Sequence, residues 1–299
     1  MRNWEPVLML LGRLQRLAGT WTVALTMGLF ATSSQAVADD VVSPRAKTVA
    51  LAYDAGSHTL LKAYPRALYR TLNEGRVWEP IELPPAVARG RIDAVSIAAQ
   101  NEALYIAGPG FGVLRSPDGG KTWTEKNAGL PSKDVIAMSA HADLPGTLYV
   151  SLAGRKLFRS EDAGDHWRLM DAGPREQVLQ LVHSNMAGSM QTGWFFAATA
   201  KGVSRSMDCF CGWRDAGGLG QRVTSVAYDL PDPKRVYAAT EGALFVSTDG
   251  GEQWTRAQSP GRAITALVVT PAGLLYAAVG EGQLFQSADH GSTWRHIDG

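Results

Sequence analysis

Short apolar runs alternate with turn residues along most of the chain. Each unit of the pattern opens with a β-prone run, as at residues 95–98, 135–138, 223–228 and 264–269. An apolar pair containing Tyr or Phe follows, and a shorter segment that begins with an apolar residue, such as Leu114-Arg115 or Phe158-Arg159, closes the unit. Short strands separated by Gly, Pro and Asp turns are typical of antiparallel β structure. The pattern therefore predicts an all-β chain.

Tryptophan reveals a repeat at the end of each unit. Six tryptophans recur at intervals of 45, 44, 46, 41 and 40 residues, namely Trp78, Trp123, Trp167, Trp213, Trp254 and Trp294. Each ends an octapeptide of the form S-x-D-x-G-x-x-W, which we call the box. Four boxes match fully. The first has Thr71 and Asn73 in place of Ser and Asp, and the fourth has Phe210 in place of Gly.

The box has the residue types of a tight turn between two strands. Its aspartates are Asp118, Asp162, Asp208, Asp249 and Asp289. Ser and Asp side chains can bond nearby backbone N–H groups and hold the turn, and Gly tolerates the positive φ that it needs. The Trp then covers the hairpin with a large apolar surface. The boxes are therefore interpreted as structural.

Four short strands in each repeat of about 40–45 residues are typical of propeller blades. We name the strands of each blade A to D, with the box joining C to D. The sequence predicts a six-bladed β-propeller of four-stranded antiparallel blades over residues 39–299, without a stable helix. Because the repeats begin with strand A and end with strand D, strand exchange between the first and last blades is expected to be weak or absent, with residues 41–42 as a candidate extra strand.

The first 38 residues differ from the rest. Three arginines (Arg2, Arg13 and Arg16) precede an apolar run at residues 17–31, and Ala36-Val37-Ala38 forms an A-x-A site. This pattern predicts a signal peptide cleaved after Ala38 and a periplasmic or secreted protein; an uncleaved membrane anchor is the alternative. The formal net charge is +1, so overall charge does not favour a nucleic-acid partner or an anionic membrane.

The box and its period resemble the BNR/Asp-box repeat β-propeller superfamily over roughly residues 45–298. That superfamily includes sialidases, the sortilin ectodomain and the photosystem II stability/assembly factor-like proteins, and the chain is most similar to the last group. This resemblance implies an exported, non-catalytic scaffold or assembly factor whose protein partner is a membrane-associated complex; an acidic surface on that partner is expected from the basic residues described below. A glycoside hydrolase or glycan-binding protein of the sialidase type is the alternative, because one propeller scaffold carries many activities.

Candidate chemistry is sparse. The Phe/Tyr-Arg-Ile-Pro type segment of sialidases has no match, and most tyrosines occupy repeat positions where core packing explains them. No histidines have the spacing of a metal site and no phosphate-binding glycine loop is present, so neither a catalytic residue, a metal nor a cofactor is predicted. Cys209 and Cys211 are the only cysteines. A strained disulfide between them, two free thiols and a redox or metal role remain alternatives.

A basic residue precedes strand A of every blade. These residues are Arg45, Arg91, Lys133, Arg175, Arg222 and Arg262. In an up-and-down blade the D–A and B–C loops share one face, which we call the D–A face; the A–B loops and boxes share the other, the box face. Lys62 with Arg66, Arg155 with Lys156, and Lys201 are expected in B–C loops of the same face. The hypothesis is a basic ring that binds an acidic partner. The alternative is solvated charge partly neutralised by Asp93, Asp134 and Glu176.

Overall fold

The computed structural model describes residues 47–99, 103–189, 193–207, 209, 212–261 and 263–297. The predicted signal peptide, Arg45, Arg262, Asp208 and Cys211 lie outside these residues. The chain divides into residues 1–41 and a compact unit, residues 42–299, which holds all the described elements. Within the described residues, no helix has the length and apolar character needed to cross a membrane.

The unit is a six-bladed all-β propeller, as the sequence predicts. Each blade is one antiparallel sheet of four strands that are consecutive in the sequence. The strands A are β1 (Ala50–Asp54), β5 (Ala94–Ile97), β9 (Val135–Ala140), β13 (Val178–Ser184), β17 (Val223–Tyr228) and β21 (Ile264–Val269). The strands B are β2 (Thr59–Tyr64), β6 (Leu104–Gly108), β10 (Leu148–Leu152), β14 (Trp194–Thr199), β18 (Val236–Thr240) and β22 (Leu275–Val279).

The outer half of each blade is a shorter hairpin. The strands C are β3 (Ala67–Thr71), β7 (Gly112–Ser116), β11 (Leu157–Ser160), β15 (Gly202–Met207), β19 (Leu244–Ser247) and β23 (Gln283–Ser287). The strands D are β4 (Glu79–Ile81), β8 (Thr124–Glu125), β12 (Arg168–Asp171), β16 (Arg214–Asp215), β20 (Thr255–Ala257) and β24 (Arg295–His296). No blade exchanges a strand with another among the described residues. The candidate strand at residues 41–42 lies outside them.

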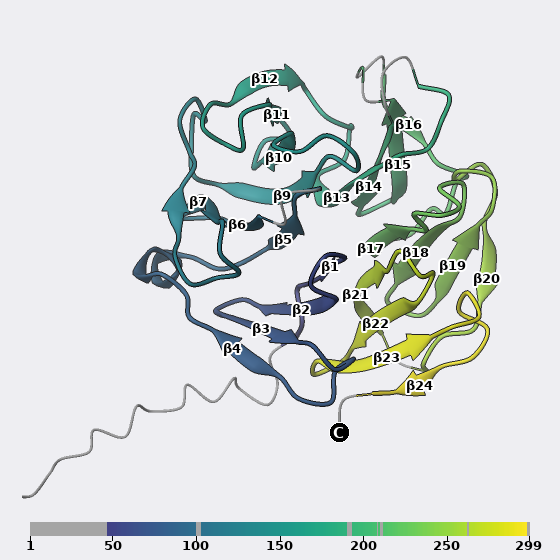
Figure 1. The fold of residues 1–299 in the computed structure, drawn as a ribbon. Helices are drawn as coiled ribbons and strands as arrows, with labels where there is room; N and C mark the ends of the chain where they lie inside the picture. Colours follow the sequence, from purple (N-terminus) through teal and green to yellow (C-terminus); the bar gives the residue numbers. More distant parts are fainter. Residues whose placement is uncertain are drawn as a thin grey trace, which may run out of the picture. The chain divides into compact units, whose positions relative to one another are not determined.

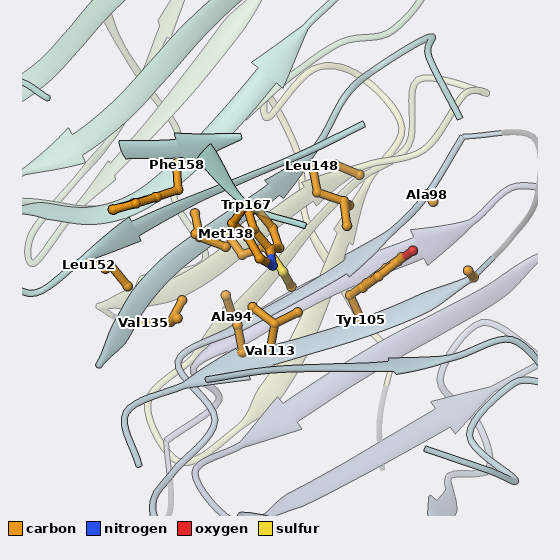
Figure 2. Packing of buried hydrophobic residues seen from close by; sticks show 14 residues of the cluster. Ala94, Ala98, Tyr105, Val113, Val135, Met138, Leu148, Leu152, Phe158 and Trp167 are labelled. Atoms are coloured by element: carbon orange, nitrogen blue, oxygen red, sulfur yellow. The ribbon is translucent and has the colours of Figure 1, made fainter. Parts of the chain in front are cut away.

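The strands A stand side by side around the axis, and the strands D lie at the rim (Figure 1). The hydrophobic core is divided among the interfaces between neighbouring blades, because each sheet buries one face against the next. Figure 2 shows the interface of blades two and three, where Trp167 lies among Met138, Val113 and Ala94. Trp167 is only 5% exposed, so this box Trp is part of the core.

The boxes form the turns that their residue types predict. In the second blade Ser116 Oγ accepts the N–H of Gly120 at 2.7 Å, and Asp118 Oδ1 accepts the N–H of Thr122 at 2.8 Å. The same pair of bonds recurs in the third, fifth and sixth boxes. The imperfect first box makes the same two bonds. The hydroxyl of Thr71 replaces that of Ser, and the side-chain amide oxygen of Asn73 replaces the carboxylate oxygen of Asp.

Each box tryptophan from the second blade onward also ties its blade to the preceding one. The indole N–H of Trp123, Trp167, Trp254 and Trp294 donates to a backbone carbonyl beside strand D of that blade, at Glu82, Lys126, Ala216 and Gln258 respectively. Trp213 instead donates to the carboxylate of Asp171 at 2.8 Å. The box Trp is thus an inter-blade staple as well as an apolar cover.

One short helical turn interrupts the otherwise all-strand pattern. A short 3-10 helix, η1 (Pro85–Arg89), connects blades one and two. Pro85 at its start has a φ already close to the helical value, and Ala86 and Val87 are buried beneath it. The linker is therefore helical rather than extended, and this turn places Ala86 and Val87 in the core.

Candidate functional site: the D–A face

Hydrogen bonds between loops establish which loops share a face. The N–H of Ile92, in a D–A loop, donates to the carbonyl of Pro65 in a B–C loop at 2.7 Å. The N–H of Gly110, in the next B–C loop, donates to the carbonyl of Lys133 at 3.1 Å. On the opposite side, the box residue Ala163 donates its N–H to Gly146 in an A–B loop. The D–A face and the box face are therefore arranged as the blade topology predicts.

Two basic residues of the predicted ring are paired with carboxylates. Arg91 donates from Nε and Nη2 to the two carboxylate oxygens of Asp93, at 2.8 and 3.0 Å. Lys133 pairs with Glu125 at 2.7 Å rather than with Asp134. Because these acids are supplied locally, Arg91 and Lys133 contribute little free positive charge.

The other two described members differ. Arg175 and Arg222 are exposed, and neither forms an ion pair within the described part of the chain. Glu176 does not neutralise its neighbour Arg175, since it pairs with Lys201 at 2.8 Å. The Arg155 guanidinium donates to the backbone carbonyl of Arg175 and so fixes this D–A loop from the adjacent B–C loop. Arg45 and Arg262 lie outside the described residues, so their part of the ring stays a prediction.

Lys62 does not belong to the ring, which corrects its expected place in a B–C loop. It lies in β2 and is 6% exposed. Its ammonium is 4.2 Å from the ring centroid of Trp78, and it donates to the carbonyl of Gly282 at 3.3 Å. The strand register, which points this side chain between blades one and six, could not be read from charge alone.

A pocket of about 500 Å³ opens on the D–A face beside blade four. Its lining combines basic, acidic and aromatic side chains from the D–A loops, the B–C turn and strand D, including Arg175, Lys201, Arg214, Glu176, Asp215 and Trp213. The guanidinium of Arg214 also lies over the ring of Trp194, 5.5 Å from its centroid. The pocket thus brings Arg175, one of the predicted basic residues, close to Trp213. The spacing of charges in the sequence did not predict this neighbour.

The box aspartates are occupied by their own turns. The hydroxyl and backbone N–H of Thr122 lower the pKa of Asp118 to about 2, and Thr293 does the same for Asp289. For Asp162, the backbone N–H and ring of His166 lower the pKa to about 2. Asp249 accepts the N–H of Gln253 in the same way. A carboxylate that accepts several hydrogen bonds stays ionised and is a poor acid catalyst. The box aspartates therefore fit a structural role.

The strand-B tyrosines do more than pack. Tyr105 receives the Nε–H of Arg115 at 3.1 Å and donates to the carbonyl of Ala163, which is in the box of the next blade, at 3.2 Å. Tyr237 OH lies 3.3 Å from Nδ1 of His290 in the box of blade six. The signal in the sequence was the Arg or Gln directly before several boxes, which pairs across strands with the tyrosine position.

Sequence reasoning also missed a close pair of buried histidines whose rings are tilted relative to each other. The rings of His141 and His183 lie 3.9 Å apart between blades three and four, and both line the central channel of about 290 Å³. Nδ1 of His141 accepts the N–H groups of Asp143 and Leu144, and Nδ1 of His183 accepts that of Ala142. These bonds order an A–B loop, so the pair is structural in this geometry.

No group of three or more His, Cys, Asp or Glu side chains within the described ranges could hold a metal ion. Cys209 is disulfide-bonded. Since Cys211 lies outside the described residues, the identity of the pairing stays a prediction.

No family model matches the chain. The fold is similar to a solved structure of YCF48 bound to a D1 peptide, with 22% identity, a TM-score of 0.58, and coverage of 84% of this chain and 82% of that one. It is also similar to an ancestral GH74 enzyme, with 18% identity and a TM-score of 0.52, over 77% of this chain and 32% of that one.

A curated relative, the oligoxyloglucan-reducing end-specific xyloglucanase of Emericella nidulans, is 22% identical over 225 residues, or 70% of this chain and 24% of the relative. A second curated relative, the probable oligoxyloglucan-reducing end-specific xyloglucanase of Neosartorya fischeri, is matched over 13% of its length. The chain thus spans about a quarter or less of the curated relatives it matches. These likenesses support the propeller fold and leave its activity open.

Proposed function

We propose that this chain is an exported, non-catalytic propeller whose D–A face binds an acidic segment of a protein partner, as an assembly or stability factor of a membrane-associated complex would. The observation that carries the proposal is the pair of exposed arginines, Arg175 and Arg222, that no described carboxylate neutralises. Arg175 also lines the pocket beside Trp213.

The physical reason is that an unpaired guanidinium can bind a carboxylate through two N–H donors without first breaking another ion pair. Because the formal net charge of the chain is only +1, its positive field is local and orients an acidic segment toward this face. The Trp213 side of the pocket offers apolar surface for a residue next to the acidic one.

The similarity to YCF48 bound to a D1 peptide supports a peptide-binding role for this fold. The proposal places the partner outside the cytoplasm, in keeping with the signal peptide that residues 1–38 predict. A membrane-associated complex is proposed as the source of the acidic segment.

Charge reversal tests this proposal. Arg175→Glu with Arg222→Glu should weaken binding of a fluorescein-labelled, glutamate-rich peptide at least tenfold at low salt, and the difference should shrink as salt rises. Arg76→Glu with Lys121→Glu, on the box face, is the matched control and should bind as wild type does. Equal affinity of both double variants would refute the proposed face, provided their melting temperatures match that of wild type.

A glycan-acting role is the second candidate. It is favoured by the xyloglucanase and GH74 similarities and by a pocket that combines Trp213 with the carboxylates of Glu176 and Asp215. Hydrolysis of xyloglucan oligosaccharides or of a chromogenic glycoside panel, abolished by Asp215→Asn, would establish this role instead. Binding of these sugars without hydrolysis would indicate a glycan-binding protein.

A further inference from the structure

The interface between blades six and one lacks the tryptophan staple that ties every other pair of neighbouring blades. Trp78 is the box tryptophan of blade one, and its Nε1 is buried without a hydrogen-bond partner. The corresponding carbonyl in blade six follows β24, where Ile297 packs against the first box instead. A buried N–H without an acceptor costs free energy, so this tryptophan contributes less to its interface than the others do.

A second set of inter-blade bonds is missing from the same interface. Around the channel, a side-chain oxygen of one strand A accepts a backbone N–H of the next strand A. Ser96, Ser139, Gln180 and Ser225 make these bonds to Ala140, His183, Val226 and Leu267, at 2.7–2.9 Å. In blade six the position that matches Ser225 in strand register is Ala266, whose side chain has no acceptor.

Blade one also lacks an inner bond to blade two, because Ala52 stands at the register position of Ser96. That interface nevertheless keeps the Trp123 staple. Within the described residues, only the interface of blades six and one lacks both kinds of bond, and it has no strand exchange to replace them.

Different contacts hold this interface, which we call the seam. The buried ammonium of Lys62 bonds the carbonyl of Gly282 and lies over the ring of Trp78. An apolar cluster of Leu51, Leu60, Ala266, Tyr276, Ala278 and Leu284 fills the interior. At the rim, Arg295 and Glu74 form an exposed pair at 3.6 Å, which contributes little. The described contacts of the seam are therefore mainly apolar packing and the bonds of Lys62.

We propose that the propeller opens at the seam, with Lys62 and Trp78 as its latch. Among the described residues, opening there breaks no strand pairing and no indole staple, whereas opening any other interface breaks at least the staple. Blades one and six then lose protection together as one cooperative unit, while the four blades between them remain closed. The seam is thus a conformational device built into the fold, independent of the function proposed for the D–A face.

Hydrogen exchange with mass spectrometry tests the proposal. In wild type at low denaturant, strands of blades one and six should exchange at least tenfold faster than those of blades three and four, and with one common dependence on denaturant. Uniform exchange across the blades, or earliest exchange at another interface, would overturn the proposal.

Two substitutions separate the seam from ordinary fraying of the chain ends. Ala266→Ser restores the missing acceptor and should slow exchange in both blades one and six by about fivefold, the factor that corresponds to ~1 kcal/mol. Ala52→Ser, which adds the equivalent hydroxyl at the interface of blades one and two, is the matched control and should leave exchange in blade six unchanged. An Ala266→Ser variant that folds but exchanges as wild type does would overturn the proposal.

Loss of the latch gives the opposite test. Lys62→Met keeps the length of the side chain but removes the ammonium, and should accelerate exchange in blades one and six at least tenfold while blades three and four are unchanged. Lys121→Met, in an exposed box, is the control. Equal acceleration in all blades would show that Lys62 acts on the whole fold and would also count against the latch.

Discussion

The indole staple can be measured by comparing two box tryptophans that differ in one hydrogen bond. Trp254 and Trp78 are both partly buried. Trp254 donates to the carbonyl of Ala216 at 2.7 Å, whereas the Nε1 of Trp78 has no partner. Replacement by Phe removes the N–H in both cases and shrinks the ring by a similar apolar area. The Lys62 ammonium also lies over the ring of Trp78 and contacts a phenyl ring less strongly, which adds to the loss in Trp78→Phe, so the difference between the two variants is a lower limit for the staple.

The magnitudes follow from this geometry. Trp254→Phe leaves the Ala216 carbonyl without its donor, which costs about 1–3 kcal/mol in addition to the lost ring area. Trp78→Phe removes a buried N–H that has no partner, so a gain of the same order offsets its lost area. We expect Trp254→Phe to lower the free energy of unfolding by at least ~1 kcal/mol more than Trp78→Phe does.

Urea unfolding followed by far-UV circular dichroism measures both values, with the denaturant slope checked for each variant because a change in slope would break the two-state comparison. A difference of ~1 kcal/mol corresponds to about 2–4 °C in melting temperature for a domain of this size. Equal losses in both variants, or a larger loss for Trp78→Phe, would refute the reasoning and would also weaken the case for the seam.

Three further expectations concern other parts of the fold. Because the box aspartates with a pKa of about 2 are depressed relative to the unfolded chain, their contribution to stability is complete above about pH 4 and is lost as pH falls toward 2, so the melting temperature should drop across that window; a constant melting temperature between pH 4 and 2 would contradict this. Tyr105→Phe removes the hydroxyl that joins Arg115 to the next box and should cost about 1–2 kcal/mol in urea unfolding, whereas no loss would show that the hydroxyl is replaceable. Thiol titration of the denatured protein should find no free thiol, and two free thiols would disprove a bond between Cys209 and Cys211.

The architecture could be predicted because its main signals are local. The box hydrogen bonds join residues two and four positions apart, as between Ser116, Asp118 and Thr122, so the residues that form the turn are adjacent in the sequence. The regular spacing of six such turns determines the number of blades and the order of strands within each blade. The side of the propeller on which each loop lies follows from that order, which is why the D–A face could also be anticipated.

Which charges on that face are free depends on contacts between loops, and those are not encoded in spacing. Asp134 adjoins Lys133 in sequence, but the partner of Lys133 is Glu125, which strand D holds 2.7 Å away. Glu176 adjoins Arg175 but pairs with Lys201 across the B–C turn. The sequence could name the candidate acids, and only the tertiary structure could assign them.

By itself, the sequence determined the fold class, the six blades, the boxes and the basic residue before each strand A, because each of these depends on residue type and on contacts within a single repeat. Only the tertiary structure decided how the blades are joined, through the tryptophan staples, the burial of Lys62 and the seam between the first and last blades. The physical reason is that these contacts join residues about forty or more positions apart, and their geometry is set by how neighbouring sheets twist and pack.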